Sequence, residues 1–193
     1  MYLKGKIFAK IFHVNNYNKK KIITYHLLNG SMKRRKKIQY IAENILKLKM
    51  SNSTKRNYMI NKENEFKRLY SHQHNQIKLV KGIKNYFKLI KKNKGDIYIV
   101  SSAPIREINL ICKLNLLNSY ITKIYDTKIS KIEALKKIHK MKNISKKNII
   151  YFGDSLSDLK VSNFLKIDFC ALLTNSKSGL NTKKTLLKIN DFV

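Results

Sequence analysis

The hydrophobic pattern along this chain changes its period near residue 80. Before that point, apolar side chains recur at helical spacing, with lysines on the opposite faces. Four such segments cover residues 3–13, 19–28, 32–49 and about 55–76. Breaks rich in Asn, Ser and Gly separate them, as is typical of loops. The pattern predicts a small α-helical layer over residues 1–79, without a clear strand.

After residue 80, short apolar runs alternate with amphipathic helices. The predicted helices cover 83–93, a segment beginning at Pro104, 130–142 and 156–165. The predicted strands cover 97–101, about 123–126, 148–152 and 168–173, with one more short element possible within 187–193. Strand–helix alternation with short links is typical of parallel, right-handed βαβ units. The fold class is therefore α/β, with a Rossmann-like parallel sheet over residues 80–193.

Length and composition limit the class of protein further. With 193 residues and 43% apolar content, the chain suits one core with a small appendage rather than a disordered protein. No apolar run approaches the roughly 20 residues that a membrane span needs, and no signal peptide is apparent. Cys112 and Cys170 are isolated, as in proteins with reduced thiols, which predicts a cytoplasmic location. The short apolar runs predict no membrane partner.

The formal net charge of +31 is large, but it is spread along the chain. Arginine occurs only at positions 34, 35, 56, 68 and 106, and lysines make up the rest on every predicted helix. A dedicated nucleic-acid surface would favour clustered Arg with aromatic residues. The scatter, together with abundant Asn and Ile, indicates A+T-rich coding instead. We expect no specific nucleic-acid partner, and a basic nucleic-acid-binding protein is a remote alternative.

Two predicted strands end abruptly in polar residues that suit catalysis. One run leads into Ser101 and Ser102, and the other leads through Gly153 into Asp154. Between them, Lys131 opens an amphipathic helix. Ligands of open α/β sheets bind at the carboxyl ends of the strands. A hydroxyl, a lysine and carboxylates at that edge predict a pocket for a small phosphorylated substrate together with magnesium.

Asp154 and Asp158 are the predicted metal ligands. Gly153 would let the backbone turn sharply at the end of the strand. Asp158 follows Asp154 by one helical turn, so both carboxylates can face one hard cation such as Mg²⁺. The alternative is that Asp154 or Ser155 merely caps the helix, while Asp158 favours its positive end.

Ser101 and Lys131 are the predicted phosphate-binding residues. The Ser101 hydroxyl and nearby backbone N–H groups can hold a phosphate oxygen, and Lys131 can neutralise the phosphate charge. Taken alone, Ser101 would be an ordinary turn residue, and a lysine in this chain is usually a solvated surface residue. Their joint order after successive strands favours the functional interpretation.

This ordered set resembles motifs II, III and IV of the haloacid dehalogenase superfamily of phosphatases. Ser101 matches the motif II hydroxyl, Lys131 the motif III lysine, and Asp154 with Asp158 the motif IV acids. The resemblance implies an α-helical cap over residues 1–79, a core over 80–193, Mg²⁺ as cofactor, and a phosphatase acting on a small metabolite. Ser101 and Lys131 would be catalytic, and the loop hydroxyls Ser102 and Ser155 would contact the substrate.

The first half of the chain is similar to the cap of a phosphoglycolate-phosphatase-like subgroup. The matching positions are Tyr25, His26, Asn29, Gly30, Arg34, Lys37 and Ile38. The chain departs from the subgroup at Ser31, where a glycine is usual, and at Lys33, where a serine is usual. By this resemblance Arg34 would grip a substrate carboxylate or phosphate. Alternatively, Arg34 is a surface residue of a basic helix.

Motif I of the family is missing from this chain. The family places a nucleophilic Asp at the end of a central strand, between the strands of motifs II and IV, whereas the first Asp here is Asp96. The resemblance therefore implies that the central strand is absent, that magnesium binds weakly, and that the chain is inactive as given. We expect roughly 15–20 further N-terminal residues in the natural or ancestral product, long enough for such a strand.

The alternative function is a non-catalytic fragment that binds a phosphorylated ligand or a partner. Neither the identity of the substrate nor the oligomeric state follows from the sequence.

Overall fold

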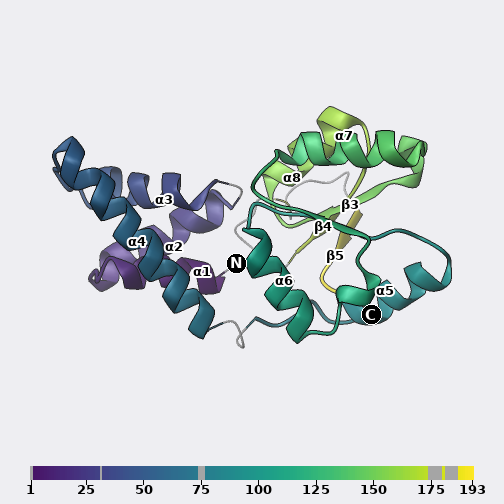
Figure 1. Cartoon of the computed structure of the whole chain (residues 1–193), viewed down its shortest axis with the longest axis horizontal. Coiled ribbons are helices and arrows are strands. Elements are labelled where there is room, and N and C mark those ends of the chain that lie inside the picture. Colours follow the sequence, from purple (N-terminus) through teal and green to yellow (C-terminus); the bar gives the residue numbers. More distant parts are fainter. Residues whose placement is uncertain (1, 31, 74–76, 174–179, 181–186) are drawn as a thin grey trace. The chain divides into compact units, whose positions relative to one another are not determined.

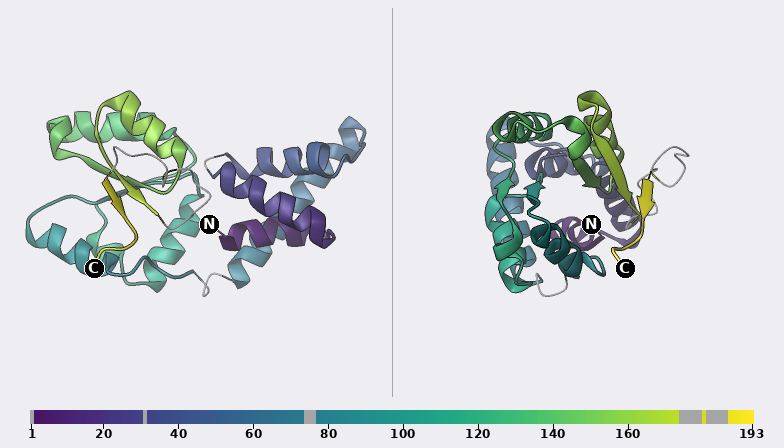
Figure 2. Two further views of the ribbon diagram at one scale, coloured as in Figure 1. Left: turned by 180° about the vertical axis from the view of Figure 1, so that it is seen from behind. Right: turned by 90° about the vertical axis from the view of Figure 1, so that its right-hand side faces the viewer.

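The computed structural model describes residues 2–30, 32–73, 77–173, 180 and 187–193 (Figure 1). The chain divides into two compact units, Met1–Lys78 and Leu79–Val193. The first unit is entirely helical and the second combines helices with strands in its described residues (Figure 2). None of the helices in the described ranges has the length and apolar character needed to cross a membrane.

The first unit contains the four predicted helical segments. They are α1 (Tyr2–Ile11), α2 (Asn16–Leu28), α3 (Arg34–Tyr40) with its π-helical extension η1 (Ile41–Ile45), and α4 (Asn52–His72). Asn15 and Ser51 cap α2 and α4, because their side chains accept hydrogen bonds from backbone N–H groups three residues later. The capping residue explains why α4 begins at Asn52, three residues before the predicted start.

The third predicted helix, over 32–49, is wrong at its end. The α-helix ends at Tyr40, the π-helical turn ends at Ile45, and Lys47 has a positive φ of 56°. Leu46 N donates to Ile41 O, and Leu48 N donates to Ala42 O. These wide turns keep Ile41 and Ala42 buried while ending the helix early.

The helices of the first unit enclose one apolar core. Its largest fully buried side chains are Ile7, Ile11, Ile22, Ile38, Ile41 and Phe66. Each such side chain contributes about 1.5–3 kcal/mol to folding when it leaves water. The core confirms that residues at helical spacing in this half of the sequence face inward.

The second unit confirms the predicted alternation of strands and helices. Its helices are α5 (Ile83–Lys92), α6 (Ile105–Leu114), α7 (Lys131–Lys142) and α8 (Leu156–Leu165), with short 3-10 turns η3 (Asn118–Tyr120) and η4 (Lys146–Asn148). Its strands are β1 (Tyr98–Val100), β2 (Lys123–Tyr125), β3 (Ile150–Gly153), β4 (Asp168–Leu172) and β5 (Leu187–Ile189). Strand β5 is the further element expected within 187–193.

The strands form two parallel sheets rather than one. Strand β1 pairs with β2, while β3 pairs with β4 and β4 pairs with β5, all in parallel. Within the described residues, no strand joins β1 to β3. The break falls between the strands of motifs II and IV, where the central strand was predicted to be absent.

The cores of the second unit lie beneath its helices. Ala134, Leu135 and Ile138 of α7 pack with the strand residues Tyr151 and Phe169. A smaller cluster under α6 contains Ile108, Cys112 and Leu117. This packing places the first residues of α7 and α8 beside the carboxyl ends of the strands.

Candidate functional site

Lys131 is the first residue of α7, and a capping box fixes the start of this helix. The Ser130 hydroxyl accepts a hydrogen bond from Glu133 N at 3.2 Å, and Ser130 N donates to Glu133 Oε2 at 2.7 Å. This reciprocal pair satisfies two helix-end N–H groups. The Lys131 side chain, 19% exposed, extends from there to Asp158.

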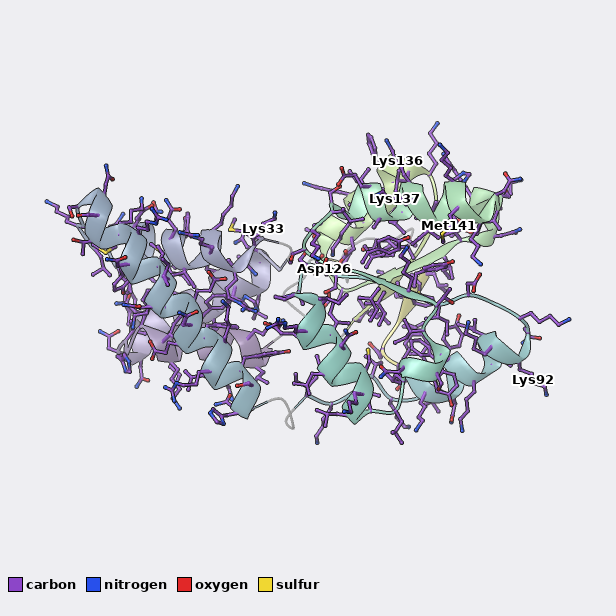
Figure 3. The ribbon with its side chains drawn as sticks, in the orientation of Figure 1. Lys33, Lys92, Asp126, Lys136, Lys137 and Met141 are labelled. Atoms are coloured by element: carbon purple, nitrogen blue, oxygen red, sulfur yellow. The ribbon has the colours of Figure 1, made fainter. Side chains whose placement is uncertain are left out.

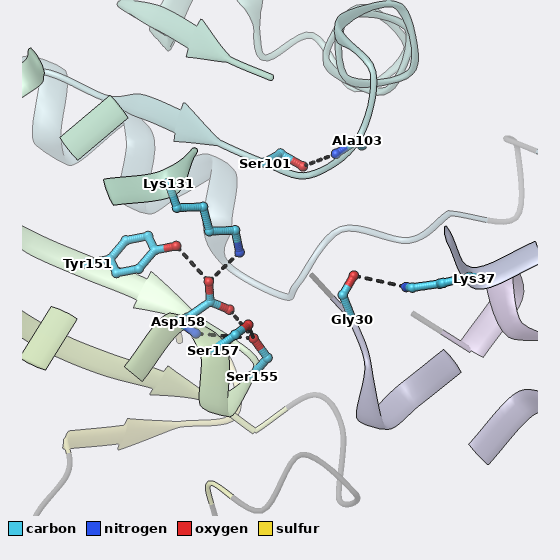
Figure 4. A network of polar contacts seen from close by, with 9 residues as sticks. All are labelled: Gly30, Lys37, Ser101, Ala103, Lys131, Tyr151, Ser155, Ser157 and Asp158. Atoms are coloured by element: carbon cyan, nitrogen blue, oxygen red, sulfur yellow. Dashed lines mark hydrogen bonds and ion pairs between the residues drawn. The ribbon is translucent and has the colours of Figure 1, made fainter. Parts of the chain in front are cut away.

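The Asp158 carboxylate is held by three donors (Figure 4). Its Oδ1 accepts from Lys131 Nζ, in an ion pair, and from the Tyr151 hydroxyl at 2.7 Å. Its Oδ2 accepts from the Ser155 hydroxyl at 2.6 Å. Burial alone raises the pKa of Asp158, but Lys131 and the Ser155 and Tyr151 hydrogen bonds outweigh burial and hold this pKa below its usual value.

Tyr151 belongs to this network, although its position in an apolar strand gave no direct sign of a site residue. Burial and the nearby Asp158 carboxylate strongly raise the pKa of Tyr151, so the phenol stays protonated and donates. The only signal in the sequence was a polar atom in an otherwise apolar run, two residues before Gly153. Buried Tyr hydroxyls usually find a partner, which is the physical basis of that signal.

Gly153 is needed for close packing rather than for a left-handed turn. Among the described glycines, only Gly82 has a positive φ. A Cβ atom on Gly153 would lie 2.4 Å from Asp158 Cβ and 3.0 Å from Phe169 Cε2. The expected turn after the strand therefore does not depend on a left-handed backbone conformation at Gly153. Because glycine has no Cβ atom, the Asp158 side chain can lie close to the strand at Gly153.

Asp154 lies between β3 and α8 and is half-buried. Burial raises its pKa, and the negative charge of Asp158 raises it further. The two negative charges thus repel each other, and a nearby cation would favour the charged form of Asp154. Asp154 takes no part in the contacts that hold Asp158.

These residues do not by themselves complete a magnesium site. Mg²⁺ prefers six oxygen ligands in an octahedron, supplied by carboxylates, waters and substrate oxygens. Both oxygens of Asp158 already accept hydrogen bonds from the protein. Across the described residues there is no group of three or more His, Cys, Asp or Glu side chains that could hold a metal. The hydrogen bonds of Lys131, Tyr151 and Ser155 described above are thus directed at Asp158 and not at Asp154.

Ser155 is the N-cap of α8, as one alternative predicted. Its hydroxyl accepts from Asp158 N at 3.4 Å and lies 2.8 Å from the Ser157 hydroxyl. Asp158 also lies in the first turn of α8, where a negative charge is favourable. The same residues therefore serve the helix and present polar groups at the strand end.

Ser101 directly follows β1, on which α7 also packs. Ser101 N donates to Tyr125 O at 2.9 Å, and its hydroxyl accepts from Ala103 N at 3.1 Å, as a turn residue would. Figure 4 shows Ser101, Lys131 and Asp158 within one close view. Ser102 is half-buried in the same loop.

Asp126 is a further acid at this edge that sequence reasoning missed. It follows β2, and its Oδ2 accepts from Ile105 N at 3.2 Å, at the start of α6. Its Oδ1 accepts from Lys128 N at 3.2 Å. Asp126 itself is labelled in Figure 3. A carboxylate directly after a strand was the signal that would have found it. Asp126 ties the loop after Ser101 to the end of β2.

Arg34 lies in the first unit. Its guanidinium carbon is 4.4 Å from the centre of the buried Phe66 ring, in cation–π geometry. Beside it, Lys37 is 3% exposed; its Nζ donates to Gly30 O at 3.1 Å and lies 3.2 Å from His26 Nδ1. Burial, with the charges of Lys4 and Arg34, lowers the pKa of Lys37 to about 7. Three of the subgroup-like positions, His26, Gly30 and Lys37, thus meet in one polar contact around the buried Lys37 amine.

The exposed lysines come from both units. Lys33, Lys92, Lys136 and Lys137 are exposed examples labelled in Figure 3. By contrast, Lys131 and Lys37 are largely buried and engaged in specific contacts. Burial therefore distinguishes these lysines, and Lys62 with a side-chain exposure of 17%, from the exposed lysines.

Known proteins of similar sequence or fold show the family to which this chain belongs. A family model described as haloacid dehalogenase-like hydrolase matches residues 8–172. A search of curated proteins found no match. Among solved structures, the chain is similar to a beta-phosphoglucomutase from Clostridium difficile, with a TM-score of 0.70, 18% identity, and coverage of 99% of this chain and 84% of that one.

Two other structures have the same fold. A protein from Haemophilus somnus, described as a predicted phosphoglycolate phosphatase, has a TM-score of 0.69, 11% identity, and coverage of 99% and 86% of the two chains. A Bacillus subtilis protein, described as a HAD hydrolase bound to magnesium, has a TM-score of 0.68, 16% identity, and coverage of 98% and 86%. The α/β fold is confirmed, and the chain belongs to the haloacid dehalogenase-like hydrolase family.

Proposed function

We propose that this protein has the binding site of a phosphomonoester hydrolase for a small phosphorylated metabolite, in the manner of phosphoglycolate phosphatases. The observation that carries the proposal is the ion pair between Lys131 and Asp158, at the start of two helices that follow strands. An amine fixed at this edge suits a phosphoryl group, since ligands of α/β sheets bind there. Ser101 at the end of β1 would donate to a second phosphoryl oxygen.

Asp158 acts in this proposal as a positioning residue. It holds the Lys131 amine in place, and Tyr151 and Ser155 in turn hold its two oxygens. Preorganised charge of this kind stabilises charge that develops on a phosphoryl group without reorganisation. Asp154 would provide the carboxylate for Mg²⁺, which, when bound, neutralises phosphate charge; the remaining ligands would come from water, substrate and groups outside this set.

The helical unit over residues 1–79 would act as a cap over the substrate. Arg34 would contact a substrate anion, supported by its cation–π contact with Phe66 in that unit. Such closure excludes water from the reacting group. Exchange of cap residues would then change the choice of substrate rather than the chemistry.

In its described residues, the chain has no Asp at the end of a strand between β1 and β3, which is where the family has its nucleophile. Its first Asp, Asp96, lies before β1, at the opposite end of the strand from Ser101. The Asp96 carboxylate bonds to Lys142 Nζ at 2.8 Å and to the Thr122 hydroxyl at 2.9 Å. We therefore expect no turnover by this chain alone. The same observation favours the second candidate function, a module that binds a phosphorylated ligand without hydrolysing it.

Binding of inorganic phosphate in the presence of Mg²⁺, measured by calorimetry, tests the site. Lys131→Met should abolish binding, because it removes the buried amine. Lys137→Met should leave binding unchanged, since Lys137 is exposed on the same helix. Equal binding by both variants would overturn the site, and hydrolysis of p-nitrophenyl phosphate by the unmodified chain would overturn the claim that it lacks a nucleophile.

A further inference from the structure

Positive charge on two helices of the first unit is not balanced by acidic residues. Eleven Lys and Arg residues come before Glu43, which is the first acidic residue of the sequence. Glu43 is itself bound to Lys55 in an ion pair and accepts a hydrogen bond from Gln39. Helices α2 and α3 contain no Asp or Glu. Although lysines occur on every helix of this protein, the field around these two helices is therefore positive throughout.

The exposed side of α2 combines aromatic and basic residues. Tyr17, Lys21 and Tyr25 follow one another at intervals of four residues, so they share one face of the helix. Tyr17 is 66% exposed, and the Lys21 amine lies 4.2 Å from the centre of its ring, in cation–π geometry. The opposite side carries the buried residues of the helix, which are Ile22, Ile23, His26 and Leu27. Tyr17 and Lys21 are thus not part of the core of the unit.

A pair of stacked tyrosine rings joins this side of α2 to α3. The ring centres of Tyr25 and Tyr40 lie 4.3 Å apart, and their planes differ by only 7°. The Tyr25 hydroxyl donates to Met32 Sδ at 3.2 Å, which helps to hold this ring in place. Tyr40 is 42% exposed. Because Tyr25 covers one face of the Tyr40 ring, this exposure lies on the other face and on the ring edges.

Two exposed lysines accompany Tyr40 on α3. Lys33 and Lys36 precede Tyr40 by seven and four residues, the spacing of one helical face. Among the residues that the structure describes, no carboxylate pairs with either lysine or with Lys21. Their amines are therefore available to an anion. We define the α2–α3 surface as the exposed side chains and the stacked pair described above: Tyr17, Lys21, Tyr25, Lys33, Lys36 and Tyr40.

We propose that the α2–α3 surface binds single-stranded nucleic acid without preference for base sequence. Its two kinds of side chain suit the two parts of such a strand. Lysines neutralise phosphate groups, and exposed aromatic rings stack on unpaired bases. A base on the free face of Tyr40 extends the stack that Tyr25 begins, and Tyr17 receives a second base. In a duplex the bases are already stacked on one another, so the rings add nothing to its binding.

An anionic membrane surface matches these residues less well. A helix that lies in a membrane interface has a broad apolar face, rich in Leu, Phe or Trp. Along α2, the exposed side offers Leu28 as its one large aliphatic residue, beside Tyr17 and Lys21. Stacked, parallel rings are a feature of base recognition rather than of insertion into lipid. Single-stranded nucleic acid is therefore the partner to which the proposal commits.

The α2–α3 surface is separate from the site of the proposed function. Neither Arg34 nor Lys131, which serve in that function, belongs to the surface. Binding through phosphates and stacking does not read base sequence. The proposal thus agrees with the expectation of no specific nucleic-acid partner.

Fluorescence anisotropy with the full chain and a labelled oligothymidylate of about 12 nucleotides tests the proposal. The oligonucleotide has no terminal phosphate, so it offers no phosphomonoester to the site around Lys131. Lys33→Gln combined with Lys36→Gln should weaken binding and reduce the slope of log affinity against log salt by about 1.4. Lys137→Gln combined with Lys140→Gln removes two exposed lysines at the same spacing on α7 and should change neither quantity. Equal losses from both pairs would show that binding follows net charge alone and would overturn the proposal.

Substitution of Tyr40 tests the stacking part. Tyr40→Leu should weaken binding of the single strand about 5- to 150-fold, whereas Tyr40→Phe keeps the ring and should retain the affinity. Urea unfolding checks that both variants are folded. Oligouridylate should give the same ranking, and binding of a DNA duplex should not differ between the two variants. An unchanged affinity of Tyr40→Leu for both single strands would overturn the proposal.

Vesicles of phosphatidylcholine and phosphatidylserine provide the remaining comparison. The full chain should bind the oligonucleotide with or without vesicles present. Vesicle binding that is lost with the Lys33 and Lys36 substitutions, together with no binding of either oligonucleotide, would assign the α2–α3 surface to membranes and reject the proposal.

Discussion

The Lys131 amine and the Asp158 carboxylate form an ion pair between two residues 27 positions apart, each in the first turn of a helix that follows a strand. The Asp158 side chain is 5% exposed and that of Lys131 is 19% exposed. Ion pairs on the surface contribute little, but removal of one member of a buried pair leaves a charge without compensation. The pair is therefore both the structural centre of the site and its most sensitive point.

Asp158→Ala should destabilise the protein by about 3 kcal/mol, the cost typical of breaking a buried pair. The change leaves Lys131, Tyr151 and Ser155 without their shared acceptor. Urea unfolding of the full chain measures the loss. The double variant Lys131→Met, Asp158→Leu removes both charges and should recover part of the lost stability. A double variant that is less stable than Asp158→Ala would contradict this account.

Acid should weaken the second unit through the same carboxylate. The pKa of Asp158 is held below its unfolded value, so the unfolded state binds a proton first as pH falls. The stabilisation is present above the unfolded pKa of Asp and is lost as pH falls through the folded pKa. Asp158→Asn should flatten the dependence of unfolding free energy on pH in this acid range. An unchanged slope would show that Asp158 is not the responsible group.

Gly153→Ala should destabilise the protein by about 1–3 kcal/mol, because overpacking forces neighbours to move. The added methyl would lie 2.4 Å from Asp158 Cβ and displace the carboxylate from Lys131. Gly5→Ala is the matched control. Gly5 lies in α1, and its added methyl would be 3.4 Å from the nearest atoms of His26 and Ile23, which leaves room for it. That change should be neutral or stabilising by up to about 1 kcal/mol. Thermal unfolding of both variants decides between these outcomes.

Raising the pH should stabilise the first unit through Lys37. Burial lowers its pKa from 10.5 to about 7, so between these values only the unfolded state carries the proton. Stability therefore rises with pH across this interval, by at most about 1.4 kcal/mol per pH unit. The groups around it are His26, Lys4 and Arg34.

Lys37→Met should remove this rise, and Lys36→Met, at an exposed position of the same helix, should keep it. Urea unfolding of the full chain at pH 6.5 and 9 measures both. A Lys37→Met protein that keeps the full pH dependence would locate the titrating group elsewhere.

The alternation of helices and strands was readable from the sequence, because side-chain periodicity and residue type are local properties. The runs ending at Ser101 and Gly153 became β1 and β3, and Lys131 became the first residue of α7. The sequence also led us to expect no strand between β1 and β3, since no Asp precedes Asp96, and none joins them among the described residues. Helix ends were less certain, as the π-helical turn over Ile41–Ile45 shows.

Only the tertiary structure decided how the polar groups pair. Residue types and their order marked Lys131, Asp154 and Asp158 as candidates, but not that Lys131 and Tyr151 would saturate an oxygen of Asp158. Nor did the sequence reveal that Gly153 makes room for Asp158, or that Tyr98 of β1 packs against the cluster that contains Tyr151 of β3. These relationships depend on packing between segments distant in the chain, whereas local pattern reports only what each segment does by itself.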